Sequence, residues 1–340
     1  AHRCDQRVTS SVTATTQSAK RPRRWSGTLG RSSEIRIFAV ALILSIYFET
    51  VNHDFLLTSA SLQNLSQFIA PVAIIAFGEI MLMIGGEIDL SAGMVFAFAP
   101  FIMHFTHEAG VPAWLSLLTG VLAAGVVGLI NGAVTVYLRI PSFVTMLGKL
   151  FFVNGLTLTI SRGTPVAPPE DTVLAAFMGG WGYSEIIWTV VLAIVMHILL
   201  RHTRWGLHTI ASGANPLGAS EAGIHVRRLK LGNFILAALL AGFTGILEGF
   251  RITSIDPQAG GNQIMFLAIA AAVIGGTPLA GGSGTIIGGL IGAAVLGILN
   301  DGFTLIGINA FTFNMILGAA ILGAMIFNIH VVRLARKGEL

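Results

Sequence analysis

The chain has 340 residues, of which 54% are hydrophobic and 11% are charged, with 41 glycines. Soluble domains carry about 25% charged residues, so this composition excludes an ordinary soluble protein and favours a membrane protein. The net charge of +4 arises in residues 1–36, and the remainder is slightly acidic, which leaves nucleic-acid binding without support. Cys4 is the only cysteine, so no internal disulfide is possible.

Residues 1–34 are rich in Ser, Thr and basic side chains. We predict that they form a disordered cytoplasmic tail that anchors the first membrane span by its positive charge. Residues 35–332 form the predicted membrane domain, and residues 333–340 form a second cytoplasmic tail.

Apolar segments of about 20 residues, long enough to cross a bilayer, recur from one end of this domain to the other. They predict an all-α polytopic protein with about ten transmembrane helices: 35–51, 65–83, 90–107, 112–137, 142–160, 185–200, 231–250, 263–279, 284–300 and 309–329. With the N-terminus inside, 18 of the 20 Lys and Arg residues fall on the cytoplasmic side, and only Arg162 and Arg251 fall outside. This bias predicts that both termini are cytoplasmic.

The two halves of the chain resemble each other. The segments 88–93 (IDLSAG), 128–131 (GLIN) and 146–148 (MLG) recur 167 to 170 residues later as 255–260 (IDPQAG), 297–300 (GILN) and 316–318 (ILG). Five predicted spans fit in this offset, and an odd number inverts the second copy. The sequence therefore predicts an inverted five-helix repeat, a common construction of transporters, with chance similarity of small-residue helices as the alternative.

Residues 201–230 form the longest polar interruption in the membrane domain. Asn215 and Pro216 are typical of a helix start, and Gly223 is typical of a left-handed stop. They predict a helix over 216–222 between flexible glycines at 213 and 223. A helix this short does not persist alone, so we expect it to lie against another part of this protein or a partner.

Carboxylates are costly in hydrocarbon, so Glu79, Glu87, Asp89 and Glu248 should face protein or water. We predict that Asp89 caps the following helix together with Ser91, with a role in the solute path as the alternative. Glu248 and Arg251 are spaced to form a local ion pair. The pairs Gly128/Gly132, Gly284/Gly288 and Gly288/Gly292 predict close helix packing.

Polar side chains within the predicted spans are candidates for a translocation path. They share uncharged or acidic hydrogen-bonding groups and are Asp89, Asn131, Asn154, Asn300 and Asn314. For the asparagines, hydrogen bonding between helices is the alternative.

Catalytic and cofactor motifs are absent. Gly148-Lys149 is not a phosphate loop, because Leu150 stands where Ser or Thr is required. His104 and His107 have no acidic cluster nearby, so we predict no metal site. We expect the chain to be a non-enzymatic subunit without a cofactor of its own.

Several motifs resemble those of one transporter family. They are 85–93 (GGEIDLSAG), 131–132 (NG), 141–148 (PSFVTMLG), 213–216 (GANP), 223–224 (GI) and Lys230. Together they resemble the permease subunits of bacterial ABC importers for monosaccharides of the ribose, xylose and galactose type. The resemblance runs from about residue 37 to residue 332 and departs at Gly218, usually Ala in the family, and at Glu221.

The resemblance implies a fold similar to the vitamin B12 importer (type II) permeases and a location in the bacterial inner membrane. It implies a second permease subunit, a periplasmic sugar-binding protein and a cytoplasmic ABC ATPase that holds ATP and Mg²⁺. The helix over 216–222 would be the coupling helix seated on that ATPase, and the coupling residues would be Gly213, Asn215, Pro216, Leu217, Gly218, Ala219, Glu221 and Gly223. We expect a weakly selective path, because the binding protein has already selected the solute.

Three alternatives remain at this point. A branched-chain amino-acid ABC permease is related, although the GANP and IDLS motifs favour sugar. An ion-coupled secondary transporter would also have inverted repeats and buried acids but would not need the capped loop helix. A passive channel or receptor would work without any ATPase. The sequence leaves open which sugar is carried and whether the permease dimer is homo- or heteromeric.

Overall fold

The computed structural model describes residues 26–309, apart from 54 and 139, and parts of 312–323. The described chain is helical, and its only bridge between extended segments is an isolated antiparallel pair, Val166 and Ile255. In chain order the helices are α1 (Ser26–Val51), α2 (Ser59–Ile84), α3 (Ala92–Glu108), α4 (Ala113–Tyr137), α5 (Ser142–Ser161), α6 (Thr172–Ala175), η1 (Ala176–Gly180), α7 (Ser184–His202), α8 (Arg204–Ala214), α9 (Pro216–Glu221), α10 (Val226–Arg251), α11 (Gly261–Ile274) and α12 (Ile286–Leu305).

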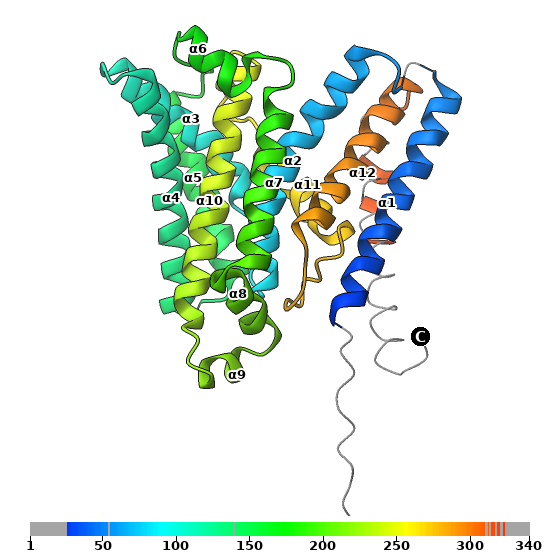
Figure 1. Ribbon diagram of the computed structural model, residues 1–340. Coiled ribbons are helices and arrows are strands. Elements are labelled where there is room, and N and C mark those ends of the chain that lie inside the picture. The colour runs from blue at the N-terminus through cyan, green and yellow to red at the C-terminus, as the bar shows by residue number, and fades with distance from the viewer. Residues whose placement is uncertain are drawn as a thin grey trace, which may run out of the picture.

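The long helices form a bundle with α6 and α9 at opposite ends, which we call the α6 end and the α9 end (Figure 1). Among the described residues, six helices are long and apolar enough to cross a membrane: α2, α4, α5, α7, α10 and α12. The chain is therefore a multi-pass helical membrane protein. Of the predicted spans, 309–329 lies largely outside the described residues, and α1 begins at Ser26, inside the segment that we predicted to be a tail.

Helix α2 is the centre of the bundle. Its residues are buried without interruption from Ile69 to Ile84, as expected of a helix that is apolar on all sides and enclosed by other helices. It packs against α7, α10, α11 and α12. Because α2 contacts helices from both halves of the chain, it joins the two halves into one core.

The helix bounds repeat at the offset seen in the sequence. Helix α2 corresponds to α10, α3 to α11 and α4 to α12, with starts or ends 167 to 169 residues apart. The packing follows the same correspondence: α2 packs on α11 and α12 of the second half, and its counterpart α10 packs on α3 and α4 of the first half. The end of α2 lies beside the start of α10 through the Glu87–Lys230 ion pair, while Arg251 at the end of α10 reaches Gln67 near the start of α2. The two copies therefore run in opposite directions.

Helices α3 and α11 are shorter than the spans predicted for them. They have 17 and 14 residues, fewer than the roughly 20 that cross a bilayer. The loops before them enter the protein interior, where Asp89 and Ile255 are buried, and the two helices start at the same place: a Cβ on Gly93 would lie 1.8 Å from the carbonyl oxygen of Gly261. The IDLSAG and IDPQAG segments that revealed the repeat are these two entry loops.

Close helix contacts explain the small-residue pairs. A Cβ on Gly128 of α4 would lie 2.6 Å from the Phe234 carbonyl oxygen of α10, and one on Gly288 of α12 would lie 2.2 Å from the Gly275 carbonyl oxygen. Real Cβ contacts are never so short, so neither site has room for a side chain. The predicted packing role of these glycines is confirmed.

Candidate functional site

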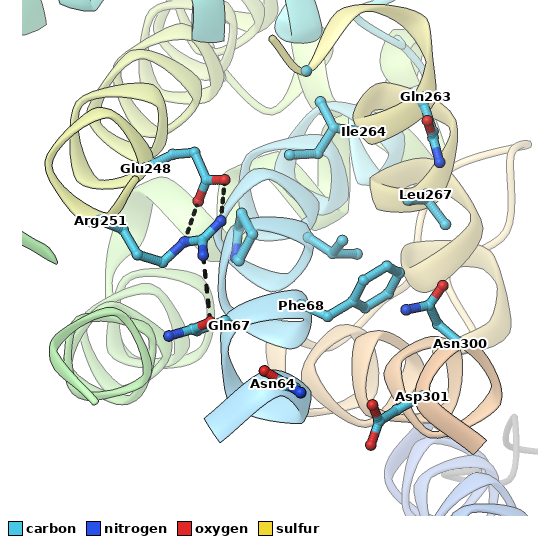
Figure 2. A pocket seen from close by; sticks show the side chains of 13 residues that line it. Asn64, Gln67, Phe68, Glu248, Arg251, Gln263, Ile264, Leu267, Asn300 and Asp301 are labelled. Atoms are coloured by element: carbon cyan, nitrogen blue, oxygen red, sulfur yellow. Dashed lines mark hydrogen bonds and ion pairs between the residues drawn. The ribbon is translucent and has the colours of Figure 1, made fainter. Parts of the chain in front are cut away.

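A polar pocket of about 380 Å³ lies toward the α6 end, between α2, α10, α11 and α12 (Figure 2). Its volume falls within the range of about 300–1,000 Å³ that is usual for small-molecule sites. Both copies of the repeat contribute helices to it. Its polar lining consists of four amides, two carboxylates and one guanidinium: Asn64, Gln67, Gln263, Asn300, Glu248, Asp301 and Arg251.

Each nitrogen of the Arg251 guanidinium donates a hydrogen bond. Its Nε donates to Glu248 Oε2 at 2.8 Å, a second nitrogen donates to Glu248 Oε1, and the third donates to Gln67 Oε1 at 3.3 Å (Figure 2). Arg251 also lies 3.4 Å from Glu185 Oε2 of α7. The predicted Glu248–Arg251 pair is confirmed, and the structure adds that it ties α10 to α2 and α7.

The other side of the pocket holds free amides and an aromatic ring. Within the described residues, the side chains of Asn64, Gln263 and Asn300 make no hydrogen bond to the protein. Phe68 projects from α2 toward Asn300 of α12 (Figure 2). Asp301 accepts a hydrogen bond from Ser61 at 2.9 Å. The pocket therefore offers unpaired amides beside an aromatic face.

A buried charge cluster lies deeper in the protein and consists of Glu79, Asp89, Ser91, Asn131 and Lys149. Asp89 Oδ2 accepts from Asn131 at 3.2 Å and lies 3.7 Å from the Lys149 ammonium. Lys149 also donates to Ser91 at 2.5 Å, and Glu79 accepts from the Asp89 backbone at 3.2 Å. The cluster joins α2, α4 and α5 to the loop before α3.

This cluster corrects one prediction. Ser91 is the N-terminal flanking residue of α3, and no side chain caps that helix; Asp89 instead bonds Ser91 itself, through its backbone N–H at 2.8 Å and through its hydroxyl. Helix capping by Asp89 is therefore wrong. Lys149, predicted to lie on the cytoplasmic side, is largely buried on α5, where its ammonium pairs with Asp89.

The five predicted path residues lie apart. Asn300 lines the polar pocket, Asp89 and Asn131 are buried in the charge cluster, Asn154 is half-buried on α5, and Asn314 is exposed. None but Asn300 contributes to the pocket. Sequence reasoning missed its partners Asn64, Gln67 and Gln263, which lie in or beside the first turns of their helices, where polar residues need no special explanation.

At the α9 end, the predicted short helix is present as α9. Asn215 accepts the Gly218 backbone N–H at 3.0 Å, Pro216 occupies the first turn, and Gly223 has φ +83. Ala219 is buried, whereas Leu217 is 79% exposed. Helix α9 projects from the end of the bundle (Figure 1), so it presents an apolar side chain to whatever binds there.

Sequence analysis missed α8, which precedes α9. Thr203 caps α8 by accepting the Gly206 N–H at 3.3 Å, and Trp205 donates to Asn233 of α10 at 2.8 Å. Gly213 belongs to this helix, and a Cβ on it would lie 1.7 Å from the Ile84 carbonyl oxygen. The prediction of a flexible Gly213 is wrong, because the end of α8 is pressed against the end of α2.

An ion pair connects the α9 segment to the loop before α3. Lys230 donates to Glu87 at 2.6 Å. Glu87 lies two residues from Asp89 of the charge cluster, and Lys230 lies in the first turns of α10, just after α9. The ion pair therefore joins α10, which follows α9 in the chain, to the loop before α3.

Residues 61–325 match the sequence profile of the family described as "Branched-chain amino acid transport system / permease component". The chain belongs to this permease family. The permease is 35% identical to the xylose/arabinose import permease protein of Sulfolobus acidocaldarius, over 90% of this chain and 88% of that one. It is 34% identical to the ribose import permease protein of Bacillus subtilis, over 86% and 90% of the two chains, and 30% identical to that of Escherichia coli K12, over 84% and 88%. No solved structure matches the permease.

Proposed function

We propose that this permease is the membrane-spanning subunit of an ATP-driven importer and forms the path for a monosaccharide or a similar small polar solute. The observation that carries the proposal is the similarity to a xylose/arabinose import permease over nine-tenths of the chain. The capped helix α9 supports it, since this short helix projects from the end of the bundle and offers a rigid surface on which a partner can dock.

The partner at α9 is a cytoplasmic ABC ATPase that carries ATP and Mg²⁺. In this proposal the α9 end faces the cytoplasm, as the basic residues Arg201, Arg204, Arg227, Arg228 and Lys230 on that side favour. Both termini then lie on the cytoplasmic side of the plasma membrane. In this proposal the chain makes the ten crossings of a type II permease. Helices α3 and α11 are too short to cross alone, so each crosses together with the entry loop before it.

Two further partners complete the importer. A secreted sugar-binding protein docks on the outer loops 163–184 and 252–262, which the paired backbones of Val166 and Ile255 join, at 2.7 and 3.0 Å. A second permease subunit, identical or not, forms the other wall of the path. ATP closes the ATPase dimer, the α9 helices move as levers, and the permease subunits open alternately to either side.

Uptake in cells that produce the permease with its ATPase and binding protein tests this function. We expect import of radiolabelled D-xylose, L-arabinose or D-ribose, and no import of L-leucine, the matched amino-acid substrate. Import should continue when an uncoupler removes the proton gradient while ATP is maintained. Import of leucine alone would point to a branched-chain amino-acid permease, and loss of import with the gradient would point to a secondary transporter.

A further inference from the structure

We infer that the polar pocket is a solute site inside a single permease subunit, which accepts uncharged polyhydroxyl solutes and rejects amino acids. The inference rests on the proposed function and goes beyond it, because the sequence alone led us to expect a weakly selective path. It assigns selectivity to side chains of the permease itself, in addition to any binding protein.

The free amides of the pocket suit hydroxyl groups. Asn64, Gln263 and Asn300 each offer one acceptor and two donor hydrogens, and these have no hydrogen-bond partner within the described residues. They come from three helices, α2, α11 and α12. Sugar hydroxyls both donate and accept, so they match the donors and acceptors of these amides.

The ring of Phe68 supplies an apolar face beside these amides (Figure 2). Small-molecule sites combine apolar or aromatic walls with a few placed polar groups. A sugar ring has the matching two surfaces, with C–H groups on its faces and hydroxyls at its edge. Phe68 and Asn300 therefore supply an apolar and a polar part of the lining of one pocket.

The charges of the pocket disfavour an amino acid. Glu248 and Asp301 are acidic, and Arg251 is the one cation among the lining residues. Each Arg251 nitrogen is already bonded, to Glu248 or to Gln67, and Glu185 lies behind it. The acidic side chains outnumber the one cation, so a solute carboxylate would meet net negative charge here, and an uncompensated charge in a semi-enclosed site is costly.

Cysteine protection tests the site directly, since Cys4 is the only native cysteine. In a Cys4→Ser background, Asn300→Cys would be labelled with a water-soluble thiol reagent in the purified permease–ATPase complex, without binding protein. We expect saturating D-xylose, L-arabinose or D-ribose to slow the labelling and L-leucine to leave it unchanged. Thr159→Cys, at an exposed position of α5 outside the pocket, is the control and should be insensitive to every solute. If Asn300→Cys assembles poorly, Gln263→Cys on α11 reports on the same site.

Transport by variants gives the second readout. Asn300→Leu should lower sugar uptake roughly tenfold, as for one lost hydrogen bond, while Thr159→Leu transports normally. Asn300→Gln, which keeps the amide, should recover part of the uptake. Equal protection by leucine would overturn the inference. So would a lack of protection by all three sugars at positions 300 and 263, in cysteine variants that still import sugar. Either result would leave the importer function intact. Failure of the unmodified importer to carry any sugar would instead overturn the proposed function.

Discussion

At the scale of single residues, the buried charge cluster shows why chemistry within a membrane is hard to predict from a sequence. Glu79, Asp89 and Lys149 each appear as isolated charges near span boundaries, and their spacing of 10 and 60 positions reveals no partnership. The fold brings them together because α2, α5 and the entry loop of α3 meet in the interior. The Glu248–Arg251 pair could be predicted because its partners are three residues apart on one helix.

Removing the cation from this cluster should destabilise the permease. Lys149→Met leaves the buried carboxylates of Asp89 and Glu79 without a counter-charge, which typically costs about 3–5 kcal/mol. We expect a marked fall in the midpoint of thermal unfolding of the detergent-purified protein. Adding Asp89→Asn to Lys149→Met removes the stranded charge and should restore part of the stability. A Lys149→Met protein that unfolds at the normal temperature would show that the cluster does not need its cation.

At the scale of helices, packing depends on positions where no side chain fits. A Cβ on Gly245 of α10 would lie 1.8 Å from the carbonyl oxygen of Phe96 on α3, whereas one on Gly155 of α5 would meet nothing within 4 Å. Gly245→Ala should therefore push α3 from α10 and destabilise the fold by about 1–3 kcal/mol. Gly155→Ala, the same chemical change in open space, should be neutral or slightly stabilising. Equal denaturation of the two variants would contradict the close contact of α3 with α10.

The α9 helix was predictable because its signals are local. Asn215, Pro216 and Gly223 each act through neighbouring backbone, and the structure has the cap, the first turn and the left-handed stop that they indicate. Helix α8 was missed because Gly213 suggested flexibility, whereas Gly206 and Gly213 are both required by close backbone contacts with α7 and α2.

Removal of the α9 cap should weaken coupling without affecting membrane insertion. Asn215→Ala loses the acceptor for the Gly218 N–H, at a cost of about 1 kcal/mol, and frays a helix that has little stability of its own. We expect reduced co-purification with the ATPase, or reduced stimulation of ATP hydrolysis by sugar-loaded binding protein. Asn215→Asp keeps the acceptor and serves as the matched control. Normal stimulation in Asn215→Ala would mean that α9 geometry does not matter for coupling.

At the scale of the whole molecule, the sequence predicted a helical membrane protein with two inverted halves, and the exchange of packing partners between α2 and α10 agrees with it. It did not predict that α3 and α11 begin in the interior, because hydropathy counts apolar residues along the chain and cannot distinguish a buried loop from a helix. For the same reason it named Asn300 and the Glu248–Arg251 pair but missed Asn64, Gln67 and Gln263, which the meeting of both halves brings into the same pocket.

The central claim is that this subunit is a path opened by the nucleotide cycle of a partner. The most direct test is reconstitution into sealed vesicles, comparing the permease alone with the permease plus its ATPase and sugar-binding protein. We predict that labelled sugar accumulates against its gradient in the complete system with ATP and Mg²⁺, and that the permease alone accumulates none. Concentration of a solute by the permease alone, without the ATPase, would contradict the account.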